Sequence, residues 1–237
     1  MKPALIFVHG FRGSHIGLED IAKEFSDYQV FAPDIPPFGD SSSLKAYDKD
    51  SYADFIANFI REHKLKKPIL VGHSMGSIIV AATAEKYPEL INEKLVLLAP
   101  ISAKPARFFA KIQPLAVILP GKVVDYITTR YLFVPHNRKL FSETIKITGE
   151  CSKKYISKAE VMAACHFSTD NEIGDFNIKK KVLLLGGEKD RLIPRKKTET
   201  LGKTLGAKTK FVAGAGHLLN YEKPRETAKI IRDFIEN

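Results

Sequence analysis

The chain has 237 residues, 44% hydrophobic and 27% charged, which fits one globular domain with a sizeable core or one domain carrying an insertion. No run approaches the ~18 to 20 uninterrupted apolar residues of a membrane span, and two cysteines are too few for a disulfide framework or a zinc site. The net charge of +10 admits an anionic partner, but the lysines are scattered without interleaved aromatics, so we expect a solvated basic surface and no nucleic-acid partner.

The first hundred residues alternate short apolar runs with amphipathic segments. Apolar runs predict strands at residues 5–8, 29–32, 69–71 and 95–98. Apolar residues at helical spacing predict helices over about 16–25, 52–60 and 78–87. The first apolar run is also too short for a signal-peptide core and has no cleavage site after it, so we expect a cytoplasmic protein that starts at or near Met1.

The alternation stops between residues 101 and 177. This stretch is apolar and helical in character, and its prolines divide it into short helices. We interpret 101–177 as a helical cap inserted into a core formed by 1–100 and 178–237. The cap either packs as core over the sheet or lines an acyl pocket, and a membrane-facing amphipathic patch is a minor alternative. The candidate substrate-binding residues in it are Phe108, Phe109, Ile112 and His166.

After the insertion the alternation resumes, with strands predicted at 181–185 and 211–212 and a closing helix that begins at Pro224. Alternating strands and helices predict an α/β fold with a parallel sheet flanked by helices on both faces. In such sheets ligands bind beyond the carboxyl ends of the strands. Catalytic residues are therefore expected directly after strands.

Ser74 lies between Gly72 and Gly76, after an apolar strand and before an apolar helix. A serine hydroxyl is a weak nucleophile that must be held next to a base, and a sharp strand-to-helix turn achieves this. Flanking glycines are needed where the turn is strained and neighbouring backbones pass close. The pattern alone is weak, and an ordinary helix N-cap is the alternative, but its placement favours a nucleophile.

Two further residues follow strands in a matching order. His217 comes after the last strand and is the candidate base, and Asp190 comes after strand 181–185 and is the candidate acid that orients it. Glu188 and Asp175 compete with Asp190, but Asp175 precedes its strand and Glu188 is expected to be solvated.

A tetrahedral intermediate also needs backbone N–H donors aimed at its oxygen. The candidates are Met75, just after the nucleophile, and Phe11, after the first strand. His9 and His73 lie beside these turns, and we interpret them as structural. Asp34 is expected to cap its own loop.

The chain resembles the α/β-hydrolase superfamily through motifs that occur in the family's order and span nearly the whole chain outside the insertion. They are His9-Gly10-Phe11, Ala32-Pro33-Asp34, residues 72–76, residues 190–194 and Gly216-His217. The resemblance implies a Ser-His-Asp acyl-transfer mechanism and a helical cap. The chain departs from the family in lacking a leading hairpin before residue 5 and in carrying a proline within 35–39 where many members have glycine.

We therefore expect a serine esterase that uses Ser74, His217 and Asp190 on a carboxylic ester with a small to medium apolar acyl group, without metal or organic cofactor. A thioesterase or a carbon–carbon bond hydrolase would use the same apparatus. A ligand- or partner-binding protein with slow or no turnover is the alternative from a different class. The expected partner is a small-molecule acyl ester, with contact to a membrane surface as a minor possibility and the oligomeric state left open.

Overall fold

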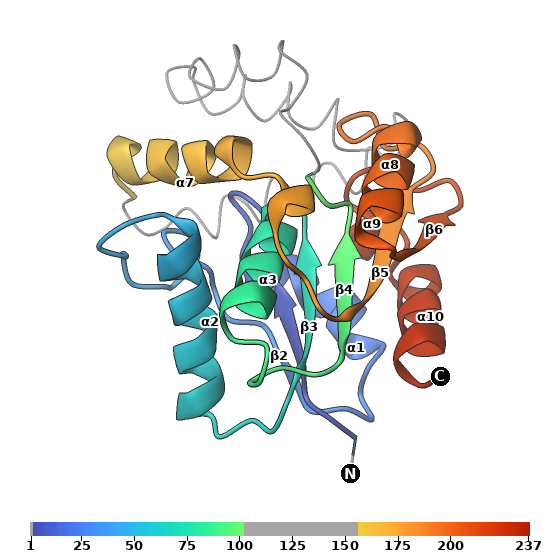
Figure 1. Cartoon of the computed structure of the whole chain (residues 1–237), viewed down its shortest axis with the longest axis horizontal. Helices are drawn as coiled ribbons and strands as arrows, with labels where there is room; N and C mark the ends of the chain where they lie inside the picture. The colour runs from blue at the N-terminus through green and yellow to red at the C-terminus, as the bar shows by residue number, and fades with distance from the viewer. Residues whose placement is uncertain (1, 102–155) are drawn as a thin grey trace.

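The computed structural model describes residues 2–101 and 156–237 (Figure 1). In these residues six strands form one sheet in the order β2-β1-β3-β4-β5-β6, and all neighbouring strands are parallel. The strands are β1 (Leu5–Val8), β2 (Val30–Phe31), β3 (Ile69–His73), β4 (Lys94–Leu98), β5 (Lys181–Gly187) and β6 (Lys208–Val212). The predicted α/β fold with a parallel sheet is confirmed, and the described sheet contains no antiparallel hairpin ahead of β1.

Helices cover both faces of this sheet. One face carries α2 (Lys49–Glu62), α3 (Met75–Lys86), α7 (Lys158–Asp170), η2 (Ile173–Asp175) and α8 (Arg195–Leu205). The other face carries η1 (His15–Leu18), α1 (Glu19–Lys23), α9 (Leu219–Glu222) and α10 (Pro224–Ile235). The central strands are largely apolar because successive side chains enter opposite cores and both cores are covered.

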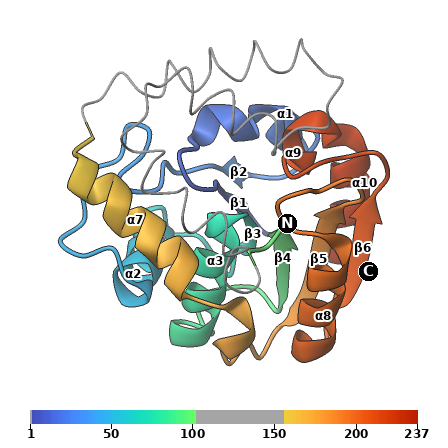
Figure 2. The same cartoon turned by 90° about the horizontal axis from the view of Figure 1, so that it is seen from above.

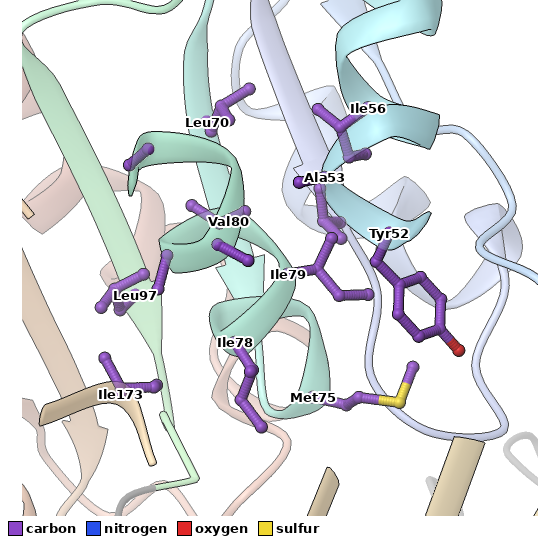
Figure 3. Packing of buried hydrophobic residues seen from close by; sticks show 14 of the residues in the cluster. Tyr52, Ala53, Ile56, Leu70, Met75, Ile78, Ile79, Val80, Leu97 and Ile173 are labelled. Atoms are coloured by element: carbon purple, nitrogen blue, oxygen red, sulfur yellow. The ribbon is translucent and has the colours of Figure 1, made fainter. Parts of the chain in front are cut away.

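The larger core lies between the sheet and α3. Figure 3 shows Ile78, Ile79 and Val80 of α3 between the strand residues Leu70 and Leu97 and the side chains of α2. Burying a large aliphatic side chain stabilises the fold by about 1.5 to 3 kcal/mol. This packing fixes the start of α3, where Ser74 lies, against β1 and β3.

Helix α7 is fastened over α2 and the loop that precedes it. Ser157 and Glu160 form a capping box at its first turn, and Glu160 also accepts hydrogen bonds from Ser43 and, at 3.0 Å, from Tyr47. The rings of Tyr52 and Phe167 lie 4.5 Å apart between centroids. In Figures 1 and 2 α7 therefore lies above α2 and α3, beyond the carboxyl ends of the strands.

The predicted domain boundaries stay a prediction, because residues 102–155 lie outside the described residues. The described end of the predicted insertion packs into the main core: Ala164, Phe167 and Ile173 share a cluster with Leu70 and Leu97. None of the helices in the described ranges would span a lipid bilayer.

Most elements end within about three residues of their predicted bounds, and the last strand and the first helix differ as follows. Strand β6 begins at Lys208 and not at Phe211, because it is an edge strand whose first residues are only partly covered, so they are not apolar. The helix predicted over 16–25 is divided into η1 and α1, which meet at Leu18.

Candidate active site

Ser74 sits on a strained turn between β3 and α3. Its φ of +54° and ψ of −118° are unusual for a residue with a side chain, and its hydroxyl makes no capping bond to α3. Its backbone N–H donates to the carbonyl of Leu98 at 2.9 Å, which ties the turn to β4. The helix N-cap alternative therefore does not account for the side chain.

The two glycines of the turn are required by close backbone contacts. A Cβ on Gly72 would lie 2.4 Å from the carbonyl oxygen of Gly76, and a Cβ on Gly76 would lie 2.2 Å from the carbonyl oxygen of Val8. Any larger residue would push α3 away from β1 and β3. The Gly-x-Ser-x-Gly spacing is thus a packing requirement of the turn that presents Ser74.

Ser74, His217 and Asp190 form a continuous hydrogen-bonded series. The Oγ of Ser74 is 3.0 Å from Nε2 of His217, and Nδ1 of His217 is 2.9 Å from Oδ2 of Asp190. All three residues are buried, with exposed fractions of 7%, 2% and 7%. They come from the loops after β3, β6 and β5, so the parallel sheet brings together residues that are 143 positions apart in the chain.

Asp190 is oriented by its own loop. Its Oδ1 accepts hydrogen bonds from the N–H groups of Leu192 and Ile193, both at 2.8 Å, which leaves Oδ2 to accept from Nδ1–H of His217. Nε2 of His217 is then the acceptor that faces the hydroxyl of Ser74. This arrangement suits a base that removes the serine proton.

The competing carboxylates lie elsewhere. Glu188 is exposed and accepts from the N–H of Gly214 at 2.9 Å, and Asp175 lies in η2, before β5. Neither contacts His217.

The turn after β1 lies against Ser74. The N–H of Gly13 donates to the carbonyl of Gly10 at 3.0 Å, and a Cβ on Gly10 would lie 3.0 Å from the Cβ of Ser74. Within residues 2–101 and 156–237 the N–H groups of Phe11 and Met75 donate to no other group. They remain the predicted oxyanion donors.

The imidazole of His9 links this turn to the loop after β2 through two hydrogen bonds. Its Nδ1–H donates to the carbonyl of Gly10 at 2.9 Å, and its Nε2 accepts from the N–H of Ile35 at 2.7 Å. The next loop is held by Asp34, which accepts from the N–H groups of His15 at 2.6 Å and Asp40 at 2.8 Å. Burial would raise the pKa of Asp34, but these hydrogen bonds outweigh it and lower the pKa below its ordinary value.

His73 joins the nucleophile strand to the loop of His217. Its Nε2–H donates to the carbonyl of His217 at 3.0 Å, and the two rings lie 5.3 Å apart between centroids. Burial, together with the neighbouring His217, lowers the pKa of His73 to about 3. Burial likewise lowers the pKa of His9 to about 4. Both side chains are neutral and hydrogen-bonded, in agreement with a structural role.

These two histidines predict a loss of stability in acid. Their pKa is about 6.5 in an unfolded chain and about 4 and 3 in the folded protein, so below pH 6.5 the unfolded state binds protons that the folded state does not. The free energy of unfolding should therefore decrease as pH falls, by on the order of 5 kcal/mol between pH 7 and pH 4 from these two groups. Urea unfolding at a series of pH values measures this dependence.

Because other groups also titrate in acid, a variant isolates the contribution of His73. His73→Gln keeps an N–H donor for the carbonyl of His217 and should reduce the slope of stability against pH between 6.5 and 4 by about one proton. His166→Gln changes an exposed histidine and serves as the control. Equal slopes in the wild type and His73→Gln would contradict the prediction.

Of the candidate substrate-binding residues, only His166 lies in the described part of the chain. His166 lies on α7 with 66% of its side chain exposed, 4.0 Å from Asp170, so its predicted contact with substrate stays a prediction. Phe108, Phe109, Ile112 and Cys151 lie outside the described residues.

Cys165 is a free, buried thiol, and burial raises its pKa to about 11. Across the described ranges no group of His, Cys, Asp and Glu side chains has an arrangement that would hold a metal ion.

One residue on a turn beside the candidate site was not singled out from the sequence. Arg12 lies in the turn from Gly10 to Gly13, directly after Phe11, and adopts a left-handed φ of +57°. The two glycines three residues apart were the available signal for this turn, but they do not indicate which central residue takes the left-handed conformation.

Comparison with known proteins agrees with this geometry. The family model for the alpha/beta hydrolase fold matches residues 3–224. The chain belongs to this family. An uncharacterized hydrolase of Bacillus subtilis is 28% identical, with 99% of this chain and 90% of that protein covered. A 2-(acetamidomethylene)succinate hydrolase of Mesorhizobium japonicum is also 28% identical, with 99% and 88% covered.

Solved structures show the same fold. An esterase from Thermogutta terrifontis superposes with a TM-score of 0.82 at 20% identity, covering all of this chain and 90% of that one. A bacterial membrane phospholipase A has a TM-score of 0.78 at 25% identity, covering all of this chain and 80% of that one. The coverage shows that this chain extends over most of the length of these hydrolases.

Proposed function

We propose that this protein is a serine hydrolase that cleaves a carboxylic ester through an acyl-enzyme. The hydrogen-bonded series from Asp190 through His217 to Ser74 carries the proposal, since it supplies a nucleophile, a base and an orienting carboxylate in one buried site. The strained conformation of Ser74 supports it, because such strain is retained where it has a function.

The proposed reaction has an acylation half and a deacylation half. The Oγ of Ser74 attacks the ester carbonyl carbon while Nε2 of His217 takes its proton, and Asp190 stabilises the imidazolium. The N–H groups of Phe11 and Met75 bind the oxyanion. His217 then passes the proton to the departing alcohol and leaves an acyl group on Ser74. Water, deprotonated by His217, attacks this acyl group, and the acid departs as the proton returns to Ser74.

Aromatic and sulfur-containing side chains next to the turns support an apolar acyl group. Phe11 lies edge-on against Phe38, with 5.2 Å between ring centroids; Phe38 belongs to the larger core, and Phe11 is partly buried and packs against that core. Figure 3 shows the side chain of Met75 extending toward the ring of Tyr52. An acyl chain leaving Ser74 in this direction would meet hydrocarbon surface, which favours its burial.

A series of p-nitrophenyl esters from acetate to laurate tests the proposal. We expect turnover that depends on Ser74, with kcat/KM highest for short to medium chains. Matched thioesters in the same assay distinguish an esterase from a thioesterase. Saturable ligand binding without product from any ester or thioester would instead support a binding protein and contradict the proposal.

Replacing Asp190 by Asn should lower kcat by about 10³- to 10⁴-fold. The remaining amide oxygen can still accept from Leu192 and Ile193, but the amide N–H₂ would donate to Nδ1 of His217 and place the imidazole proton on Nε2. In that tautomer His217 cannot accept the proton of Ser74. Steady-state kinetics on p-nitrophenyl butyrate measure the loss.

Glu188→Gln provides the matched control in the same loop, since Glu188 is exposed and contacts Gly214 and not His217. It should leave kcat at the wild-type value. A loss of kcat in Glu188→Gln as large as that in Asp190→Asn would contradict the assignment of the acid.

A further inference from the structure

We propose that Arg12 binds an anionic group of the substrate, so that the preferred esters carry a carboxylate or phosphate in addition to the reacting carbonyl. This inference rests on the proposed ester hydrolysis and names the substrate class of the same site. It adds one anionic group, on either half of the ester, to the proposed substrate.

Arginines in the described part of the chain fall into two groups. Four are held by other side chains: Arg61 by Asn58 and Tyr87, Arg195 by Glu199 and Phe211, Arg225 by Glu24, and Arg232 by Asp27. The side chains of Arg12 and Arg191 are exposed and have no hydrogen bond, ion pair or ring contact with any described residue. These two are the arginines on the loops of the candidate site.

Arg12 is the one beside the nucleophile. It follows β1, which pairs directly with β3, whereas Arg191 follows β5, and β4 lies between β5 and β3. Neighbouring strands lie about 4.8 Å apart, so the turn of Arg12 is one strand from Ser74 and the loop of Arg191 is two. A Cβ on Gly10 would lie 3.0 Å from the Cβ of Ser74, which places this turn against the nucleophile.

The backbone at Arg12 favours glycine or asparagine over arginine. A φ of +57° lies in the left-handed region, which residues with longer side chains disfavour. No contact within the described residues compensates for an arginine there. Lys64 and Lys67 also adopt a left-handed φ, so it is the position of Arg12 in the turn against Ser74, and not its backbone alone, that points to a role in binding a ligand.

The chemistry of the surroundings points to an anion. A guanidinium offers a planar set of N–H donors that matches a carboxylate or a phosphate. The carboxylates of the neighbouring loops already have partners. Asp34 accepts hydrogen bonds from His15 and Asp40. Asp190 accepts hydrogen bonds from His217 and from its own loop. No carboxylate of residues 2–101 or 156–237 neutralises the positive charge of Arg12.

Two pairs of esters test the inference, each pair differing in one charge. The first pair, mono-p-nitrophenyl succinate and p-nitrophenyl butyrate, tests a carboxylate on the acyl half. The second pair, butyrylglycerol phosphate and butyrylglycerol, tests a phosphate on the alcohol half. We expect the wild type to favour the anionic member of at least one pair by about 10-fold in kcat/KM, mainly through KM, after correction for the uncatalysed rates. The pair that shows the preference identifies the source of the charge.

Arg12→Gln should bring the ratio of kcat/KM for the anionic ester to kcat/KM for its neutral partner to about one. Arg12→Lys should retain part of this preference, because a lysine keeps the charge without the planar donor set. Lys66→Gln removes one exposed positive charge before β3, at the amino-terminal ends of the strands and so away from Ser74. This control variant should keep the wild-type ratio of kcat/KM values. A wild-type ratio of one or less in both pairs, or an equal ratio in the wild type and Arg12→Gln, would overturn the inference.

Failure of the proposed function has a different signature, namely no turnover of either member of either pair. In that case calorimetry on Ser74→Ala with monomethyl succinate and glycerol phosphate still tests Arg12. Binding that is at least 10-fold weaker after adding Arg12→Gln would support the inference, and binding of equal strength or no binding of either anion would overturn it.

Discussion

Ser74→Ala is expected to lower kcat on p-nitrophenyl esters by at least about 10⁴-fold while the protein stays folded. The substitution removes only the hydroxyl, and no other nucleophilic side chain of the described residues lies within hydrogen-bond distance of Nε2 of His217. Alanine keeps the Cβ, so contacts of the turn with Gly10 remain. Stopped-flow or steady-state assays at high enzyme concentration measure the residual rate.

The decrease in kcat caused by Ser74→Ala should not add to the decrease caused by a second substitution among Ser74, His217 and Asp190. His217→Ala removes the base that faces Ser74, and the double variant should be about as slow as either single variant, because nucleophile and base act as one unit. A double variant slower by the product of the two single effects would show that the two side chains act independently and would contradict the proposed mechanism.

Gly76→Ala is expected to destabilise the fold by several kcal/mol, which is a large part of the stability of a domain of this size. The added Cβ would lie 2.2 Å from the carbonyl oxygen of Val8 and 2.7 Å from that of His9. Both are backbone atoms of a buried strand and its end, so relief of the clash requires α3 to move away from the sheet. Urea unfolding followed by circular dichroism measures the change in free energy.

Gly17→Ala is the matched control, because a Cβ on Gly17 would have no heavy atom within 4 Å and its φ is not in the left-handed region. This substitution should be neutral or stabilise the protein by a few tenths of a kcal/mol, up to about 1 kcal/mol, through the unfolded state. Equal stabilities of Gly76→Ala and Gly17→Ala would contradict the close packing of α3 on β1.

The sheet was predictable from the sequence because strands covered on both faces leave uninterrupted apolar runs. Residues 5–8 and 69–71 show this directly, and β1 and β3 occupy them. Edge strands give a weaker signal. Lys208, Thr209 and Lys210 of β6 have one partly exposed face and therefore read as a polar segment.

The candidate site was predictable because the parallel topology brings the ends of separate strands to one edge. The positions of Ser74, Asp190 and His217 after β3, β5 and β6 were sufficient to expect them together, and the structure places them within hydrogen-bond distance. Their catalytic roles remain proposals that the kinetics above test.

Contacts between distant loops were not predictable. The bond from His73 to the carbonyl of His217 joins residues 144 positions apart and depends on the placement of two loops. The left-handed φ of Arg12 depends on the closure of the turn between Gly10 and Gly13. By contrast, the Ser157 and Glu160 capping box of α7 follows the known Ser-x-x-Glu pattern and was available in the sequence.

Intact mass after incubation with a fluorophosphonate tests the central claim most directly, because the reagent forms a covalent adduct with an activated serine. The account predicts one adduct on the wild type, mapped to Ser74 in the peptide digest, and none on Ser74→Ala. No adduct on the wild type, or an adduct that persists in Ser74→Ala, would contradict the assignment of Ser74 as the nucleophile.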